Sequence, residues 1–190
     1  MKKIIITTLV ALTISYPVIA QKKAIFSSKN YFGITSGENG TNPQLQTING
    51  FKIGKWFTGI GTGIDWYYQR SIPLFLSADR YFAIKPRRSF LISGDAGINF
   101  PWKQDNYYNY WNYYGNSKMV PGFYWATGLG YRIGVGKQND AVLLHVGYIN
   151  KLYKEKSTYV SPCLVAPCPE NVNTFNYNLK GISVKIGYGF

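Results

Sequence analysis

His145 is the single histidine of the sequence and the side chain best suited to activate a nucleophile. Ser93 and Asp95 share its expected strand face, and a serine, a histidine and an acid together support acyl transfer. His145 is expected near the middle of a strand, however. An enzyme acting on membrane lipid needs its catalytic group near the end of a strand, where the lipid arrives. We therefore predict no catalytic residues and favour an internal polar network. Its expected members are Lys52, Asp65, Asp95, Arg132, His145 and Lys185.

Residues 107–115 have the most unusual local composition of the chain, because tyrosine alternates with asparagine around one tryptophan. Flat aromatic rings and amide groups suit stacking and hydrogen bonding to sugars or protein partners. The alternative is a loop that packs on itself and binds nothing. The candidate binding residues are Tyr107, Tyr108, Tyr110, Trp111, Tyr113 and Tyr114.

The first twenty residues are organised as a signal peptide. Lys2 and Lys3 precede an apolar stretch from Ile4 to Ile14, and Ala20 supplies a small residue at the expected cleavage site. We expect residues 1–20 to be removed and residues 21–190 to form one domain. An uncleaved anchor helix is the alternative, which the short length and Pro17 disfavour.

Cys163 and Cys168 lie in a proline-rich segment and are the two cysteines of the sequence. In an exported protein they are expected to form a disulfide that closes the tip of a loop. A metal or redox site is disfavoured because the pair lacks CxxC spacing and a nearby histidine. We expect no metal and no cofactor.

Beyond residue 21 the chain alternates apolar residues with small or polar ones at period two, which predicts strands. In the final strand Ile182, Val184 and Ile186 alternate with polar residues and glycine. Charged residues make up only 15% and aromatic residues 17%, which disfavours a disordered chain and an ordinary cytosolic helical domain. Eight strands of about ten residues are expected. They lie near residues 31–35, 50–54, 59–68, 72–83, 90–100, 123–135, 142–148 and 182–190.

The expected connections are short on one side and long on the other. Turns are predicted at 55–56, 85–88 and 136–140, opposite a brief connection at 69–71 and longer ones. The three long loops are expected at 36–43, 101–120 and 150–178. This segregation, and an inner face rich in glycine, indicates an all-β, eight-stranded antiparallel up-and-down transmembrane β-barrel with a lumen filled by side chains.

Two glycine-rich stretches, Gly59 to Gly63 and Gly128 to Gly130, superficially resemble dinucleotide-binding loops. That fingerprint must close a strand and open a helix, whereas these strands continue through the glycines. Room inside a narrow barrel is the preferred interpretation.

Basic residues outnumber acidic ones by 21 to 8, a formal net charge of +13. Export and the scattered arrangement disfavour nucleic-acid binding. Six lysines are expected near the outer rim, where they would pair with lipopolysaccharide phosphates. They are Lys103, Lys118, Lys151, Lys154, Lys156 and Lys180.

The signal peptide, the eight alternating segments and the ending Lys185-Ile186-Gly187-Tyr188-Gly189-Phe190 together resemble the small outer-membrane β-barrel proteins of Gram-negative bacteria. The segments Gly50 to Lys52 and Asp95 to Trp102 most resemble barrels of the Bacteroidetes type. The resemblance implies outer-membrane localisation and a barrel fold, but no particular activity. The ending, with Tyr188 and Phe190, is similar to the signal that the barrel-assembly machinery recognises.

We therefore expect a non-catalytic integral outer-membrane barrel with a structural or surface-binding role through its extracellular loops. Outer-membrane lipid, lipopolysaccharide, a surface ligand and a larger membrane complex are the expected partners. A barrel enzyme that modifies lipid A and a secreted soluble β-sandwich adhesin are the alternatives.

Overall fold

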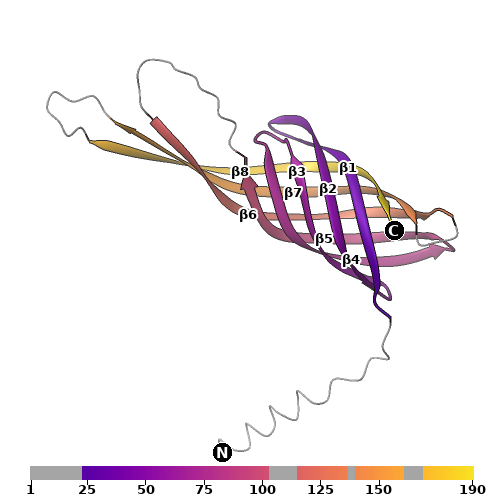
Figure 1. Cartoon of the computed structure of the whole chain (residues 1–190). Coiled ribbons are helices and arrows are strands. Elements are labelled where there is room, and N and C mark those ends of the chain that lie inside the picture. Colours follow the sequence, from indigo (N-terminus) through magenta and orange to yellow (C-terminus); the bar gives the residue numbers. More distant parts are fainter. Residues whose placement is uncertain (1–22, 103–114, 137–139, 161–168) are drawn as a thin grey trace, which may run out of the picture.

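The computed structural model describes residues 23–102, 115–136, 140–160 and 169–190. Within these ranges no helix is long and apolar enough to cross a membrane. All regular elements of the described chain are strands (Figure 1). They are β1 (Ile25–Gly37), β2 (Gly40–Ile53), β3 (Trp56–Asp65), β4 (Ser71–Lys85), β5 (Arg88–Pro101), β6 (Gly115–Gly134), β7 (Ala141–Val160) and β8 (Glu170–Gly189).

The eight strands form one closed antiparallel sheet in the order of the chain. Each strand pairs with the next, and β1 pairs with β8 from Lys29↔Gly189 to Ser36↔Ile182. The backbone amides of Ser28 and Phe190 bond each other's carbonyl oxygens at 2.9 and 3.0 Å, which joins the two ends of the sheet. Closure leaves no free edge in this ring, so the barrel prediction is confirmed and the β-sandwich alternative is wrong.

Three predicted loops are shorter in the structure than in the sequence analysis. The expected loop at 36–43 is wrong, because β1 and β2 pair as far as Gly37↔Gly40 around a tight turn. The last residues of the expected loop at 101–120 belong to β6, which begins at Gly115. Most of the expected loop at 150–178 is also strand, since β7 continues to Val160 and β8 begins at Glu170.

As a result, β6, β7 and β8 are each 20 residues long and run well beyond the other five strands (Figure 1). Pairing of β5 with β6 stops at Asn99↔Gly122, and pairing of β1 with β8 stops at Ser36↔Ile182. Above these points β6 to β8 form a projecting three-stranded sheet, which we call the extension. We call the opposite end of the barrel, where β1 begins and β8 ends, the terminal mouth.

Side chains alternate between the interior and the exterior along every strand, as period two requires. The interior holds a packed cluster around Phe57, Phe75, Leu91 and Leu143, each 2% exposed or less. Asp79 is buried while its neighbour Arg80 points outward, so the two adjacent charges take opposite faces of β4.

Interior glycines make room for the large side chains opposite them. A Cβ atom at Gly61 would lie within 2.3 Å of the Phe75 ring, and one at Gly33 would lie 2.7 Å from the Lys185 side chain. Space rather than backbone freedom therefore explains the glycine-rich inner face.

Candidate functional site

Three lysines lie at different heights inside the barrel, and each is nearly or fully inaccessible. Lys29, nearest the terminal mouth, forms an ion pair with Asp79. Its Nζ also lies 3.3 Å from the centre of the Phe57 ring, a cation–π contact. Pairing with a carboxylate and a ring offsets the desolvation of this buried ammonium group.

The middle lysine is Lys185, whose Nζ donates to the Gln46 side-chain oxygen at 2.8 Å. Asp95 is close enough to attract it electrostatically. The third is Lys151, whose Nζ lies 3.1 Å from Asp65 and 3.2 Å from the Ser71 hydroxyl. Each interior lysine thus has an aspartate within electrostatic range, and two of the three, Lys29 and Lys151, form ion pairs.

This arrangement differs in part from the six-residue network expected from the sequence. Asp65, Asp95, His145 and Lys185 are buried inside the barrel. Lys52 and Arg132 are only partly buried and line the terminal mouth instead. The sequence analysis missed Lys29 and Asp79 and placed Lys151 wrongly.

Lys151 was expected at the outer rim facing lipopolysaccharide, and this is wrong because its side chain is fully buried in the lumen. Of the other lysines in that group, Lys118, Lys154, Lys156 and Lys180 are exposed, and Lys103 lies outside the described residues.

His145 and Ser93 do meet, since the serine Oγ lies 2.7 Å from the histidine Nε2. The histidine Nδ1 is buried and has no hydrogen-bond partner in the described structure, so no acid orients the ring as a catalytic triad requires. Both residues are at most 8% exposed. Within the described chain, no group of three or more metal-ligating side chains comes together.

The two faces of the extension continue the exterior and the interior of the barrel, but the kinds of side chain that they carry are different. On the face that continues the exterior, apolar residues such as Val146 and Ile182 give way to exposed lysines. Lys118 and Lys156 stand directly opposite each other on β6 and β7. Like charges opposite each other are destabilising in the absence of an anion. We call this surface the lysine face, formed by Lys118, Lys154, Lys156 and Lys180.

The other face of the extension carries Tyr153 and Tyr177, and Tyr67 and Tyr68 pack against them from the connection between β3 and β4. We call these four residues the tyrosine cluster. The rings of Tyr153 and Tyr177 stack with centroids 4.7 Å apart. The Tyr177 hydroxyl donates to Glu155 at 3.1 Å, and the Ser117 hydroxyl donates to the other oxygen of that carboxylate at 2.6 Å. Burial and the hydrogen bond to Glu155 raise the pKa of Tyr177, so its hydroxyl stays protonated as a donor.

The exterior of the barrel below the extension is apolar on all sides. Leu76 and Leu129 are 66% and 64% exposed, far from the burial such residues seek in water. Large apolar side chains also point outward from the remaining strands. Examples are Phe32, Leu45, Ile60, Ile92, Val146 and Ile182.

A closed barrel with an apolar belt and a polar, side-chain-filled interior defines the class of protein. The chain is an eight-stranded antiparallel up-and-down transmembrane β-barrel of the outer-membrane type. Two solved structures share this fold with it at low sequence identity.

One is the outer membrane protein AlkL, determined by solid-state NMR in DMPC lipid bilayers, with a TM-score of 0.50. It is 12% identical, and the match covers 93% of this chain and 94% of that one. The other is the crystal structure of OprG from Pseudomonas aeruginosa, with a TM-score of 0.56 and 12% identity over 89% of this chain and 96% of that one. No protein-family model and no curated protein matches the sequence.

Several residues singled out by the sequence lie outside the described residues: the signal segment 1–20, Cys163 and Cys168, and the tyrosine-rich residues 107–114. Tyr188 and Phe190 are described, and their side chains are 47% and 48% exposed beside the terminal mouth. The tyrosine cluster was missed because Tyr153 and Tyr177 fell within an expected loop. From Thr174 to Lys180 polar residues alternate with Phe175, Tyr177 and Leu179, and this alternation was the signal that indicated a strand there.

Proposed function

We propose that the protein is a non-catalytic integral outer-membrane barrel that binds the phosphate-bearing headgroups of lipopolysaccharide through the lysine face. In this orientation the terminal mouth faces the periplasm and the extension projects from the cell surface. The observation that carries the proposal is the change from apolar to cationic residues on one continuous exterior surface.

The height of the lysine face supports this assignment. On β8 the exterior side chains change from Ile182 to Lys180 within two residues, and on β7 Tyr148 lies opposite Ile182. Tyrosine marks the boundary between hydrocarbon and headgroup in such barrels. Lys154 lies six residues beyond Tyr148, about 20 Å along the strand. The lysines thus lie beside the phosphate and sugar region of the outer leaflet rather than beside its acyl chains.

The interior supports a closed, non-catalytic barrel. Eight strands leave only enough width for side chains, and those of the three interior lysines and the hydrophobic cluster occupy that width. Ser93 and His145 form a contact that suits nucleophile activation, but lipid at the outer rim does not reach a buried pair. We expect no acyl transfer and no pore activity.

The experiment measures binding of purified lipopolysaccharide to the full barrel in detergent. Replacing Lys118, Lys154 and Lys156 with glutamine is expected to weaken association at least about tenfold and to reduce its dependence on salt. The matched control replaces Lys55, Lys85 and Arg87 with glutamine, which removes the same charge at the opposite end. Equal binding by the two triple variants would contradict the proposal.

A second candidate function rests on the tyrosine cluster. The stacked Tyr153 and Tyr177 rings and the Glu155 carboxylate present aromatic and hydrogen-bonding groups side by side, which suits a sugar or protein partner at the cell surface. The tyrosine-rich residues 107–114 are proposed separately as a ligand-binding loop, on their composition alone. At the other end of the chain, we expect Tyr188 and Phe190 to serve recognition by the barrel-assembly machinery.

A further inference from the structure

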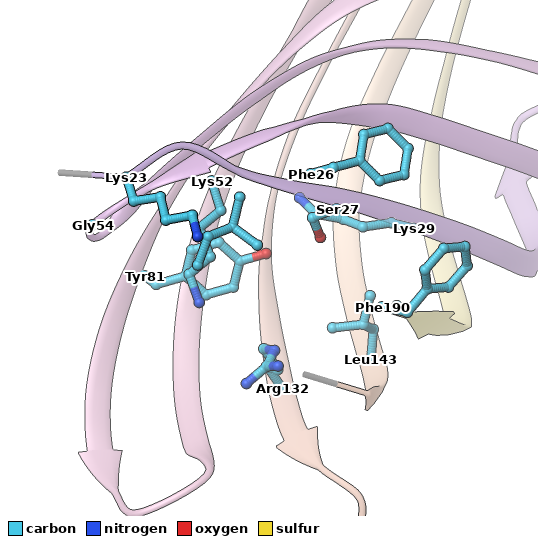
Figure 2. A pocket seen from close by; sticks show the side chains of 12 residues that line it. Lys23, Phe26, Ser27, Lys29, Lys52, Gly54, Tyr81, Arg132, Leu143 and Phe190 are labelled. Atoms are coloured by element: carbon cyan, nitrogen blue, oxygen red, sulfur yellow. The ribbon is translucent and has the colours of Figure 1, made fainter. Parts of the chain in front are cut away.

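Arg80 is a cation on the outward-facing surface of the barrel. Its side chain is exposed on the exterior of β4, whereas its neighbours along the chain, Asp79 and Tyr81, are buried. Figure 2 shows the Tyr81 ring inside the terminal mouth near Lys52, so the alternation along β4 turns Arg80 toward the lipid. The other charged residues that the structure describes lie in the interior, at the two ends of the barrel or in the extension.

The neighbours of Arg80 on this surface are apolar. In the sheet it stands opposite Trp56 on β3 and Ile92 on β5, which are 54% and 49% exposed. Its guanidinium carbon lies 5.2 Å from the centre of the Trp56 ring and 5.3 Å from that of the Phe82 ring, two cation–π contacts. The two ion pairs of the described chain join other residues. The rings therefore hold the guanidinium group in place without supplying a negative charge.

The depth of Arg80 on the barrel suits contact with lipid headgroups. Trp56 begins β3 directly after the turn at the terminal mouth, and tryptophan is typical of the boundary between hydrocarbon and headgroups. Phe82 lies two residues further along β4 toward that mouth, so the contact with its ring directs the guanidinium group away from the membrane centre. A charge on the lipid face destabilises a barrel at the membrane centre and is tolerated near the headgroups.

On the side of Arg80 that faces the membrane centre, the exterior carries small side chains. Thr58, Ala78 and Gly94 stand opposite one another on β3, β4 and β5. A Cβ atom at Gly94 would have no other atom within 4 Å, so this position is open. Further from the terminal mouth the large Leu76 side chain is 66% exposed. A hydrocarbon chain can therefore approach the barrel closely beside Arg80 and pack against it.

We propose that Arg80 binds the phosphate group of a phospholipid in the periplasmic leaflet. The guanidinium fork donates to two phosphate oxygens, and one acyl chain of the same lipid lies over Ala78 and Gly94. A phospholipid fits because its anionic group is attached to hydrocarbon, which matches one cation within an apolar surface. The choice of leaflet rests on the orientation proposed above, but the site lies at the opposite end of the barrel from the lysine face.

The test uses the full barrel purified in maltoside detergent and counts retained lipid by native mass spectrometry. The two probes, dioleoyl phosphatidylethanolamine and diolein, carry the same acyl chains, but diolein lacks the phosphate. The unchanged protein is expected to retain the phospholipid at least about tenfold better than diolein, and Arg80→Gln is expected to remove that preference. The matched control, Arg87→Gln, removes the same charge from the exposed turn between β4 and β5 and should keep it.

Gly94→Leu tests the contact with the acyl chain. The added side chain fills the open position, so retention of both lipids should fall while the preference for the phospholipid remains. Heat-dependent gel mobility of each variant verifies that the barrel is folded.

Three results would overturn the inference: a preference that survives Arg80→Gln, an equal loss of preference in the Arg87→Gln control, or unchanged retention of both lipids by Gly94→Leu. The orientation is tested separately, by labelling Lys154 and Lys156 on intact cells with an amine reagent that does not cross membranes. Labelling only after cell lysis would overturn the periplasmic leaflet as the source of the lipid. The retention measured in detergent does not depend on that result.

Discussion

Single residues inside the barrel restrict which side chains fit beside them, and they also stabilise the neighbours that they contact. Phe75 is 2% exposed, and its ring occupies the space beside Gly61 that any side chain at that position would need. Lys151 and Asp65 are an example of stabilisation by contact. Each charge is tolerated in the interior only because the other is present.

Gly61→Ala is expected to destabilise the barrel by about 1–3 kcal/mol, because the new methyl group collides with the Phe75 ring. The midpoint of urea unfolding, followed by tryptophan fluorescence in detergent, measures the change. Gly94→Ala is the matched control, since a Cβ there has open space within 4 Å. Equal midpoints for the two variants would show that the lumen adapts to the extra volume.

Lys151→Met is expected to destabilise the barrel by about 3–5 kcal/mol, because it leaves the Asp65 carboxylate buried without its cation. Adding Asp65→Asn should recover much of that loss. The amide oxygen of asparagine still accepts the hydrogen bond that the Tyr67 backbone amide donates to Asp65 at 2.7 Å. The same urea titration measures both variants, and additive losses would mean that the two side chains do not depend on each other.

Part of this interior followed from the sequence, because period-two alternation placed Asp65, Asp95 and Lys185 on the inner face. Lys29 was missed because the first strand was expected to begin at Tyr31, two residues after it. Lys151 was assigned to the surface because it stands in a run with Lys154 and Lys156. Alternation distinguishes the two faces only once the segment is known to be a strand.

At the scale of elements, the polarity of the two faces of a strand changes where the strand leaves the barrel and enters the extension. Below Ile182 the β8 exterior is apolar and the alternation with polar residues is plain. Above it the alternation is inverted, because Tyr177 and Leu179 lie on the other face and polar residues take the exterior. This pattern is opposite to that of the membrane-spanning part of the strand, so the segment was taken for a loop. For this reason the number and order of the strands were predicted correctly, whereas the extension was not.

The turns at the terminal mouth are short and one contains a strained residue. Arg87 has a φ of 65° in the two-residue turn between Lys85 and Arg88. Arg87→Gly is expected to stabilise the barrel by about 1 kcal/mol, because glycine adopts this left-handed conformation without steric conflict. Arg88→Gly, within β5, removes the same charge without relieving strain and should not raise the urea midpoint.

For the whole molecule, a closed sheet filled with side chains predicts two physical properties. The unboiled protein should migrate differently from the boiled protein on a denaturing gel, because detergent alone does not open a fully hydrogen-bonded barrel. In planar lipid bilayers the folded protein should show no steady ion conductance, because eight strands leave no aqueous channel. Identical mobility in both samples would contradict the closed barrel, and stable current steps would contradict the filled lumen.

The two ends of the barrel contact different chemistry in this arrangement. In the proposed orientation the lysine face lies beside the outer leaflet, and the exposed Lys55 and Lys85 of the terminal mouth lie beside the inner one. The described interior lysines are balanced by aspartates, so the cations left for the proposed membrane contacts are the exposed ones at the two ends of the barrel. Contact with membrane surfaces, rather than solubility in water, is the role proposed for the exposed cations at both ends.

The pairing of β1 with β8 differs from every other strand pairing of the barrel in its separation along the sequence. Every other seam links strands that are neighbours along the chain, so each can form as a local hairpin soon after its residues are available. The pairing of Lys29 with Gly189 instead joins segments about 160 residues apart in the sequence, and its loop-closure entropy is the largest in the fold. We therefore expect the ring to close last, through the two hydrogen bonds between Phe190 and Ser28.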